Sequence, residues 1–245
     1  MIRIKDHQNI VTLTLNRPGK RNALSIKMID AIHKGLDEIE KNTAMRVFVL
    51  AGEGQSFCSG MDLRGVLDEP EAMGSMLQGF SKVTQRIRKL PVPTISRVQG
   101  AAVGGGCGLM VVCDFAFTHP ESKVGYPEVD LGVCPAVVAP WLMKKLGPGK
   151  ARTMLLAGGT ISGQQGFDSG LATHLCELDE LIEATETFAL NLARGGQEAM
   201  SVTKQWLNEL DGSLDSEVMV KAAELSAEVI KGEEAQSRLR PLFKK

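Results

Sequence analysis

One carboxylate in this sequence has surroundings that suit proton transfer. Glu128 follows Pro127 within residues 124–133, and most of its neighbours there are apolar or glycine. Such surroundings disfavour the charged form of a carboxylate and raise its pKa toward the value that a general base needs. Asp130 would share a face with Glu128 only if this segment were a strand. A loop salt bridge is the commoner role of a single glutamate, so both interpretations stay open here.

Two glycine-containing segments could present backbone N–H groups to a ligand. Gly60 lies in residues 56–63, directly after a predicted strand, and three consecutive glycines (104–106) precede an apolar helix. Bare amides at a helix N-terminus bind anions or stabilise a developing oxyanion. Neither the dinucleotide-binding nor the P-loop spacing is present. Taken alone, the first segment is better explained as an ordinary tight turn, and the second equally well by close helix–strand packing.

A basic turn could bind phosphate groups. Arg17, Lys20 and Arg21 place three cations within five residues, in a segment of turn-forming residues. Guanidinium and ammonium groups are the usual phosphate donors. A solvated basic turn is the more frequent explanation for this pattern on its own.

The composition excludes several classes of protein. The 245 residues carry 28 Lys and Arg against 29 Asp and Glu, a net charge of −1 that gives no basic field for nucleic acid or a membrane surface. Aromatic residues make up only 4%, which argues against base stacking. No apolar run is long enough for a bilayer, and the N-terminal residues do not resemble a secretory signal. Five scattered cysteines indicate neither a disulfide framework nor a metal site, so a cytoplasmic protein is expected.

The elements that must position these residues alternate between strands and helices. Alternating or continuous apolar residues predict strands at 11–15, 46–50, 94–98 and 115–117. Helical spacing predicts a helix capped by Ser25, and further helices at 71–89, 181–192, 199–210 and 218–230. We therefore predict one α/β core, residues 1–195, followed by a helical C-terminal region, residues 196–245.

Taken together and in order, the segments resemble the enoyl-CoA hydratase/isomerase (crotonase) superfamily over essentially the whole chain. The matching stretches are residues 15–18, 22–24, 57–63, 100–109, 113–114, 127–128, 131–132 and 157–172. The resemblance implies a spiral of strand–strand–helix turns with trailing C-terminal helices that form trimers, often paired into hexamers. It also implies an acyl-CoA thioester substrate, with coenzyme A present as part of that substrate and no permanently bound cofactor or metal.

The resemblance implies roles for particular residues. The amides of Met61 and Gly105 would hold the thioester oxygen and stabilise an enolate, and Glu128 would transfer the proton. Coenzyme A contacts are implied for Arg17, Lys20, Arg21, Ala23, Leu24, Asp62 and Leu63. The substrate pocket is expected to include Gly60, Gly104, Gly108, Tyr126 and Pro135, with residues 65–80 over the acyl end. Asp62 and Asp114 match aspartates that we interpret as structural, and a buried structural role is the more frequent one for Tyr126.

One departure from the family pattern leaves the reaction open. Gly108 stands where the family's hydratases carry their first glutamate, so only the second, Glu128, is present. One carboxylate suffices for a Δ3-Δ2-enoyl-CoA isomerase, whereas hydration usually needs two. However, residues 132–140 resemble hydratases of branched or glutaconyl-type acyl-CoAs, and Asp62, Asp68 or Asp130 could supply another acid. A non-catalytic acyl-CoA-binding protein, a decarboxylase and a thioester hydrolase also stay open as hypotheses.

Overall fold

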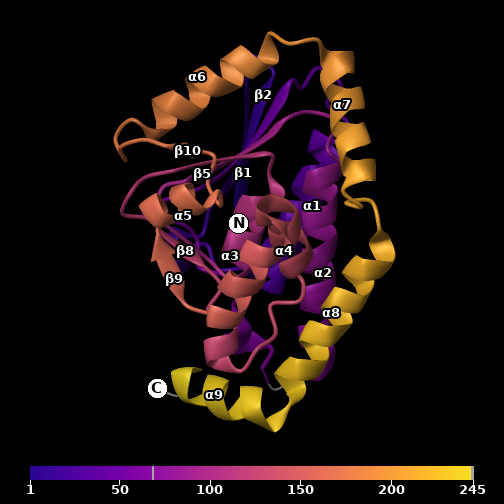
Figure 1. The fold of residues 1–245 in the computed structure, drawn as a ribbon. Helices are drawn as coiled ribbons and strands as arrows, with labels where there is room; N and C mark the ends of the chain where they lie inside the picture. Colours follow the sequence, from indigo (N-terminus) through magenta and orange to yellow (C-terminus); the bar gives the residue numbers. More distant parts are fainter. Residues whose placement is uncertain (68, 244–245) are drawn as a thin grey trace.

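The computed structural model describes residues 1–67 and 69–243, whose strands form two sheets (Figure 1). In this part of the chain the larger sheet has the order β1-β2-β3-β5-β7-β10, and all its neighbours are parallel except β1 and β2. Its strands are β1 (Ile2–His7), β2 (Ile10–Leu15), β3 (Val47–Gly52), β5 (Thr94–Val98), β7 (Phe115–Thr118) and β10 (His174–Leu175). The smaller sheet contains β4 (Ser56–Cys58), β6 (Ala101–Val103), β8 (Lys123–Gly125) and β9 (Thr160–Ser162), in that order.

The two sheets are built by repeated turns of the chain. In each turn the first strand enters the larger sheet and the second enters the smaller one, as with β3 and β4, β5 and β6, and β7 and β8. The first two turns close with α2 (Pro70–Lys89) and α3 (Gly105–Val112). The predicted α/β spiral of strand–strand–helix turns is therefore confirmed.

The first helix shows how local sequence starts an element. α1 (Ile26–Ile39) begins after Ser25, whose side chain accepts a hydrogen bond from the Met28 N–H at 3.3 Å. An N-cap serine satisfies one of the amides that a helix leaves without an intrahelical partner. The apolar residues at helical spacing face the core, and Ile29, Ile32, Leu36 and Ile39 are all buried.

Pattern reasoning located several of the longer elements, but it missed the six-residue strand β1 and the shortest strands. The predicted helix at 71–89 is α2, and the predicted strand at 94–98 is β5. By contrast, β4, β6 and β8 have three residues each, which is too short for a period of two to stand out. These short strands matter because β4, β6 and β8 lead directly into Gly60, Gly104 and Glu128.

The remaining helices cover the spiral. They are α4 (Ala139–Ala157), α5 (Gly163–Ser169), α6 (Leu181–Ala193), α7 (Gln197–Leu210), α8 (Ser216–Lys231) and α9 (Glu233–Phe243), and the 3₁₀ turns are η1 (Pro18–Lys20), η2 (Leu63–Gly65) and η3 (Val129–Leu131). Figure 1 shows α7 and α8 beside α1 and α2, with α9 below α4. None of the helices in the described ranges is long and apolar enough to cross a membrane.

A partly buried polar network attaches α7 to the core. Lys204 of α7 donates hydrogen bonds to Asp114 Oδ2 and to the Val92 carbonyl oxygen, both at 2.8 Å. Burial opposes ionisation of Asp114, but Lys204 and Arg88 outweigh it and lower the pKa of this carboxyl. Arg88 also pairs with Asp211 at 2.7 Å, just beyond the end of α7. The helical C-terminal region is thus attached to Val92, just before β5, and to Asp114, just before β7. Its assignment as a separate trimerisation region stays a prediction.

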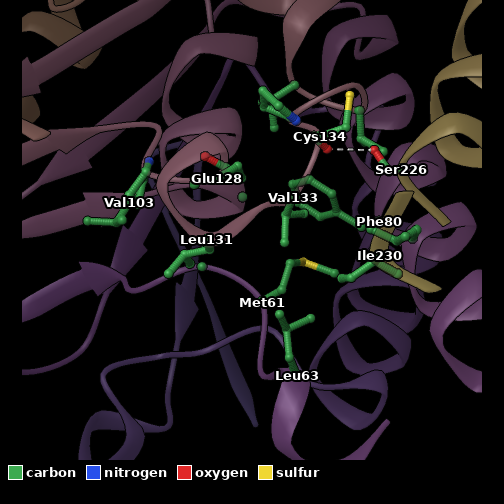
Figure 2. A pocket seen from close by; sticks show the side chains of 18 of the residues that line it. Met61, Leu63, Phe80, Val103, Glu128, Leu131, Val133, Cys134, Ser226 and Ile230 are labelled. Atoms are coloured by element: carbon green, nitrogen blue, oxygen red, sulfur yellow. Dashed lines mark hydrogen bonds between the residues drawn. The ribbon is translucent and has the colours of Figure 1, made fainter. Parts of the chain in front are cut away.

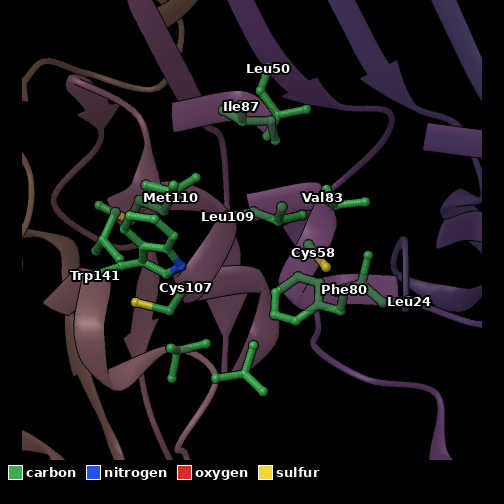
Figure 3. Packing of buried hydrophobic residues seen from close by; sticks show 14 of the residues in the cluster. Leu24, Leu50, Cys58, Phe80, Val83, Ile87, Cys107, Leu109, Met110 and Trp141 are labelled. Atoms are coloured by element: carbon green, nitrogen blue, oxygen red, sulfur yellow. The ribbon is translucent and has the colours of Figure 1, made fainter. Parts of the chain in front are cut away.

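The main hydrophobic core lies between α2, α3 and the sheets. Figure 3 shows Phe80 and Val83 of α2 near Leu109 and Met110 of α3, all buried. Trp141 closes one side of this cluster and donates to Thr84 Oγ1 at 3.0 Å, which satisfies its buried indole N–H. Phe80 belongs to this core and also lines a cavity that contains Met61 and Glu128.

Candidate active site

A cavity of about 130 Å³ lies where the smaller sheet meets α2 and α8. Figure 2 shows Glu128 on one side of it and Phe80, Ser226 and Ile230 on the other. Its lining is mostly apolar. The full set comprises Ser59, Gly60, Met61, Leu63, Leu77, Phe80, Val103, Gly104, Gly105, Pro127, Glu128, Leu131, Val133, Cys134, Pro135, Val137, Val138, Ser226 and Ile230.

The N–H group of Met61 points away from its neighbouring segment. Leu24 and Met61 form a parallel bridge, in which the Leu24 N–H donates to the Gly60 carbonyl at 2.8 Å and the Asp62 N–H donates to Leu24 at 3.0 Å. The C=O of Gly60 and the N–H of Met61 belong to one trans peptide group, so they point in opposite directions. The Met61 amide therefore points away from Leu24, and it belongs to a residue that lines the cavity.

A second amide comes from the start of α3. Gly104 precedes the helix with φ +56°, a conformation that favours glycine, and the first intrahelical bond joins the Gly108 N–H to the Gly104 carbonyl. Gly105 is the first residue of α3, so its N–H has no acceptor within the helix. A methyl group added at Gly106 would lie 2.1 Å from the Cys58 carbonyl oxygen. Glycine thus brings the start of α3 against the end of β4, beside Met61.

Glu128 lies against this amide-bearing loop. Glu128 Oε1 is 2.8 Å from the position that a methyl group on Gly104 would occupy. Its other oxygen, Oε2, is buried and has no hydrogen-bond partner within the described residues. Burial raises the pKa of Glu128 to about 7. This environment fits a proton-transfer group, whereas a loop salt bridge would place a cation beside the carboxylate.

Among the described residues, none on the opposite wall of the cavity carries a carboxylate. A methyl group added at Gly108 would lie 2.4 Å from Val138 Cγ1 and 3.4 Å from Phe80 Cζ, so these two side chains fill the space in front of Gly108. Asp62 pairs with Arg17 at 2.9 Å, and Asp130 accepts a hydrogen bond from the Gly159 N–H at 2.8 Å. Neither aspartate lines the cavity. Asp68, the third acid considered from the sequence, lies outside the described residues.

The basic turn lies next to the Met61 loop. Arg17 contacts Asp62, the Arg21 carbonyl accepts from the Ser59 N–H at 3.0 Å, and Asn22 donates to the Ser56 carbonyl at 2.8 Å. Lys20 and Arg21 are exposed, so their charges are available to solvent. The turn therefore flanks the cavity on the side of Met61.

The structure brings about half of the sequence-predicted site residues together at the cavity. Glu128, Met61, Gly105, Gly60, Gly104, Pro135 and Leu63 line the cavity. Gly108 and Tyr126 do not: Val138 covers Gly108, and Tyr126 is fully buried, with its hydroxyl pKa raised by that burial. Arg17, Lys20, Arg21, Ala23, Leu24 and Asp62 lie outside the lining, although Leu24 and Asp62 flank Met61 in the bridge.

Sequence reasoning missed the contribution of α8. Ser226 and Ile230 line the cavity although they lie about a hundred residues beyond Glu128, in a region expected only to join subunits. Their helical spacing of four residues indicates a shared face. Nothing in that pattern identifies which element the face meets.

The fold and the cavity together define the class of the protein. It is a spiral α/β protein whose mostly apolar cavity is lined by Met61, by Gly105 and by one carboxylate, Glu128. The family model for enoyl-CoA hydratase/isomerase matches residues 5–238, and the chain belongs to this family, within the crotonase superfamily.

Relatives and solved structures agree with this assignment. A putative enoyl-CoA hydratase of Thermus thermophilus is 29% identical, with 83% of this chain and 82% of that protein covered. The mitochondrial methylglutaconyl-CoA hydratase of mouse is 30% identical over 84% of this chain and 68% of the relative. A putative enoyl-CoA hydratase structure from Mycobacterium avium paratuberculosis has a TM-score of 0.89 at 26% identity, covering 99% of this chain and 96% of the other.

Proposed function

We propose that this chain acts on enoyl-CoA thioesters with Glu128 as its single acid/base, and that it is a Δ3-Δ2-enoyl-CoA isomerase. The observation that carries the proposal is the asymmetry of the cavity. One carboxylate, Glu128, lines the cavity together with Met61 and Gly105, while Val138 and Phe80 fill the space in front of Gly108. Such a site can remove and return one proton without a second acid.

The proposed reaction uses the residues as follows. The amides of Met61 and Gly105 donate to the thioester oxygen, and Glu128 removes a proton from carbon 2 of a 3-enoyl thioester. The electron pair passes into the conjugated enolate, whose negative oxygen is stabilised by the two amides. Glu128 then returns the proton to carbon 4, which leaves the double bond between carbons 2 and 3. No atom is gained or lost.

Hydration is the second candidate, because relatives of this chain carry the name enoyl-CoA hydratase. A hydratase would add water at carbon 3, so the substrate would gain its mass. A non-catalytic acyl-CoA-binding protein, a decarboxylase and a thioester hydrolase are the remaining candidates. Each predicts a different mass change or none.

Mass spectrometry in heavy water separates these reactions. Purified protein is incubated with 2-enoyl-CoA and 3-enoyl-CoA, and products are compared by mass and by double-bond position. We expect interconversion of the two enoyl isomers with deuterium incorporation and no added water. A 3-hydroxyacyl-CoA product would identify a hydratase, and the absence of both exchange and any new product would identify a binding protein. Because Glu128 must be ionised to accept the proton, kcat/KM should fall about tenfold per pH unit below its pKa of about 7.

We further propose that coenzyme A enters only as part of the substrate and that the protein works in the cytoplasm, as a homotrimer or a pair of trimers. Support for assembly comes from apolar side chains on α7 that are more than half exposed, at Trp206, Leu207 and Leu210. Sedimentation of the purified chain tests this. A monomer at micromolar concentration would contradict it.

A further inference from the structure

We infer that the cavity selects a short, uncharged acyl group, and that Leu77 of α2 together with Ser226 and Ile230 of α8 forms the wall that ends it. The inference rests on the proposed function, because it takes the thioester to lie between Met61, Gly105 and Glu128. It goes further by naming the acyl class and the residues that select it.

The direction of the acyl group follows from the two sides of the cavity. The exposed cations Lys20 and Arg21 flank the cavity beside Met61, which is the side suited to the phosphates of coenzyme A. The acyl group must then extend the other way, past Glu128. Figure 2 shows Ser226 and Ile230 across the cavity from Glu128.

The end wall is buried and tied down. Ser226 and Ile230 are each 2% exposed and Leu77 is 7% exposed, and α2 packs along α8. Ser226 Oγ donates to the Cys134 carbonyl oxygen at 3.0 Å, which joins α8 to the loop that follows Glu128. α9 also supports this loop, since Arg238 donates to the Asp130 carbonyl at 3.3 Å. A longer acyl chain would have to displace α8 from both the loop and α2.

The volume of the cavity limits the length of the acyl group. Apolar protein cavities of about 150 Å³ hold benzene, a molecule of six carbons. A cavity of about 130 Å³ therefore accommodates an acyl group of about four to six carbons. We therefore expect decanoyl and longer groups to extend beyond this space.

The lining also selects against charge. None of the described residues that line the cavity is a lysine, arginine or histidine, and the carboxyl group present is Glu128 itself. A terminal carboxylate on the acyl group would be desolvated without a cation and would lie near Glu128. An uncharged hydrocarbon chain would instead contact Leu77, Val133 and Ile230.

Binding of saturated acyl-CoAs tests the inference without depending on turnover. Calorimetry would compare acetyl-, butanoyl-, hexanoyl-, octanoyl-, decanoyl- and glutaryl-CoA. Each buried methylene is worth about fourfold in affinity, so Kd should fall by about that factor per methylene as far as hexanoyl and no further. Glutaryl-CoA should bind at least about tenfold more weakly than butanoyl-CoA. Affinity that keeps rising to decanoyl, or tight binding of glutaryl-CoA, would overturn the inference.

Two variants test the residues of the end wall. Leu77→Ala and Ile230→Ala should each improve the affinity for octanoyl-CoA about tenfold relative to hexanoyl-CoA, by making room for one or two more methylenes. Val83→Ala on α2 and Met219→Ala on α8 are matched controls, because both residues are buried and neither lines the cavity. Leu77→Val and Ile230→Val give smaller shifts in the same direction if the alanine variants do not fold. A length profile identical to that of the controls would contradict the assignment.

The outcomes also separate this inference from the proposed function. If no acyl-CoA binds and no isomerisation occurs, both fail. If acyl-CoAs bind and isomerise with no dependence on length, only the inference fails.

Discussion

The two walls of the cavity differ in the chemical groups that they present. One wall presents Glu128, a buried carboxylate with a pKa of about 7, against the loop of Gly104 and Gly105. The facing wall presents Val138 and Phe80 in front of Gly108 and contributes only shape. The same crotonase framework therefore supports both walls, and the proposed reaction assigns proton transfer to only one of them.

In the proposed reaction, this difference makes proton transfer depend on the side chain at a single position. In a spiral of short strands, backbone amides are placed by the fold itself, so Met61 and Gly105 can act whatever their side chains are. A carboxylate must instead be supplied by sequence, and Gly108 does not supply one. In the proposed reaction the fold would therefore provide the stabilisation of the enolate, while individual side chains would decide where protons and water go.

Glu128→Gln removes the chemistry of the first wall and has the largest expected effect. Turnover should fall about 10²–10⁴-fold, because the amide keeps the shape of the side chain but cannot take up the proton. Deuterium exchange at carbon 2 measures this directly. Glu121→Gln, an exposed glutamate on the loop before β8, serves as the control and should keep the rate of the parent protein. An unchanged rate in Glu128→Gln would reject the assignment of the base.

Gly108→Ala probes the second wall through stability. Alanine in place of glycine normally stabilises a helix interior by about 0.5–1 kcal/mol. Here the added methyl would meet Val138 Cγ1 at 2.4 Å, so we expect a loss of about 1–3 kcal/mol instead. Gly74→Ala on α2 is the control, since a methyl group there meets nothing within 4 Å.

Combining Gly108→Ala with Val138→Ala sharpens the test. Removing Cγ1 of Val138 should relieve the clash, so the double variant loses less stability than the sum of the two single variants, by about 1 kcal/mol or more. Urea denaturation measures all four proteins. Strict additivity would show that Val138 does not fill the space at Gly108.

How far the sequence predicted this site depends on how local the signal is. The Ser25 cap and the apolar stripe of α1 lie within one helix, and both were predicted correctly. Glu128 was singled out because Pro127 and the apolar residues that surround it are adjacent in sequence. The contact of Val138 with the Gly108 site joins segments thirty residues apart and was not predicted, because no local pattern reports which side chain fills a gap.

The role of α8 was missed for a similar reason. Ser226 and Ile230 show an ordinary amphipathic pattern, and such a pattern reveals a buried face without revealing its partner. The buried face of α8 packs along α2, and this packing places Ser226 and Ile230 at the cavity. Only the arrangement of the whole chain sets this relation.

Burial of the ionised Glu128 side chain should also lower the free energy of unfolding, by an amount that depends on pH. Its pKa is about 7 in the folded protein against 4.5 ordinarily, so the unfolded chain loses this proton first as pH rises. Stability from this group therefore falls between about pH 4.5 and 7, and the loss is complete above pH 7. Glu128→Gln should be more stable than the parent by about 2–3 kcal/mol at pH 8 and equal to it near pH 4. Thermal denaturation at both pH values tests this, and a stability difference independent of pH would contradict it.

Ser226→Ala has the smallest expected effect. It tests whether α8 acts independently of the wall that carries Glu128. The Ser226 hydroxyl donates to the Cys134 carbonyl and joins α8 to the loop beyond Glu128, without touching Glu128 itself. Losing this partly buried hydrogen bond should cost about 1 kcal/mol of unfolding free energy. Ser237→Ala is the matched control, because the Ser237 hydroxyl makes an exposed bond to the Glu234 carbonyl at 2.8 Å.

The kinetic signature of Ser226→Ala distinguishes an end wall from a catalytic wall. If α8 only bounds the acyl group, the variant should alter KM for hexenoyl substrates and leave kcat and its pH dependence unchanged, since Glu128 keeps its surroundings. A fall in kcat with a shifted pH profile would instead mean that α8 holds Glu128 in place. The assignment of proton transfer to one wall and acyl-group binding to the other would then be wrong. A helix of the C-terminal region would influence proton transfer as well as substrate binding.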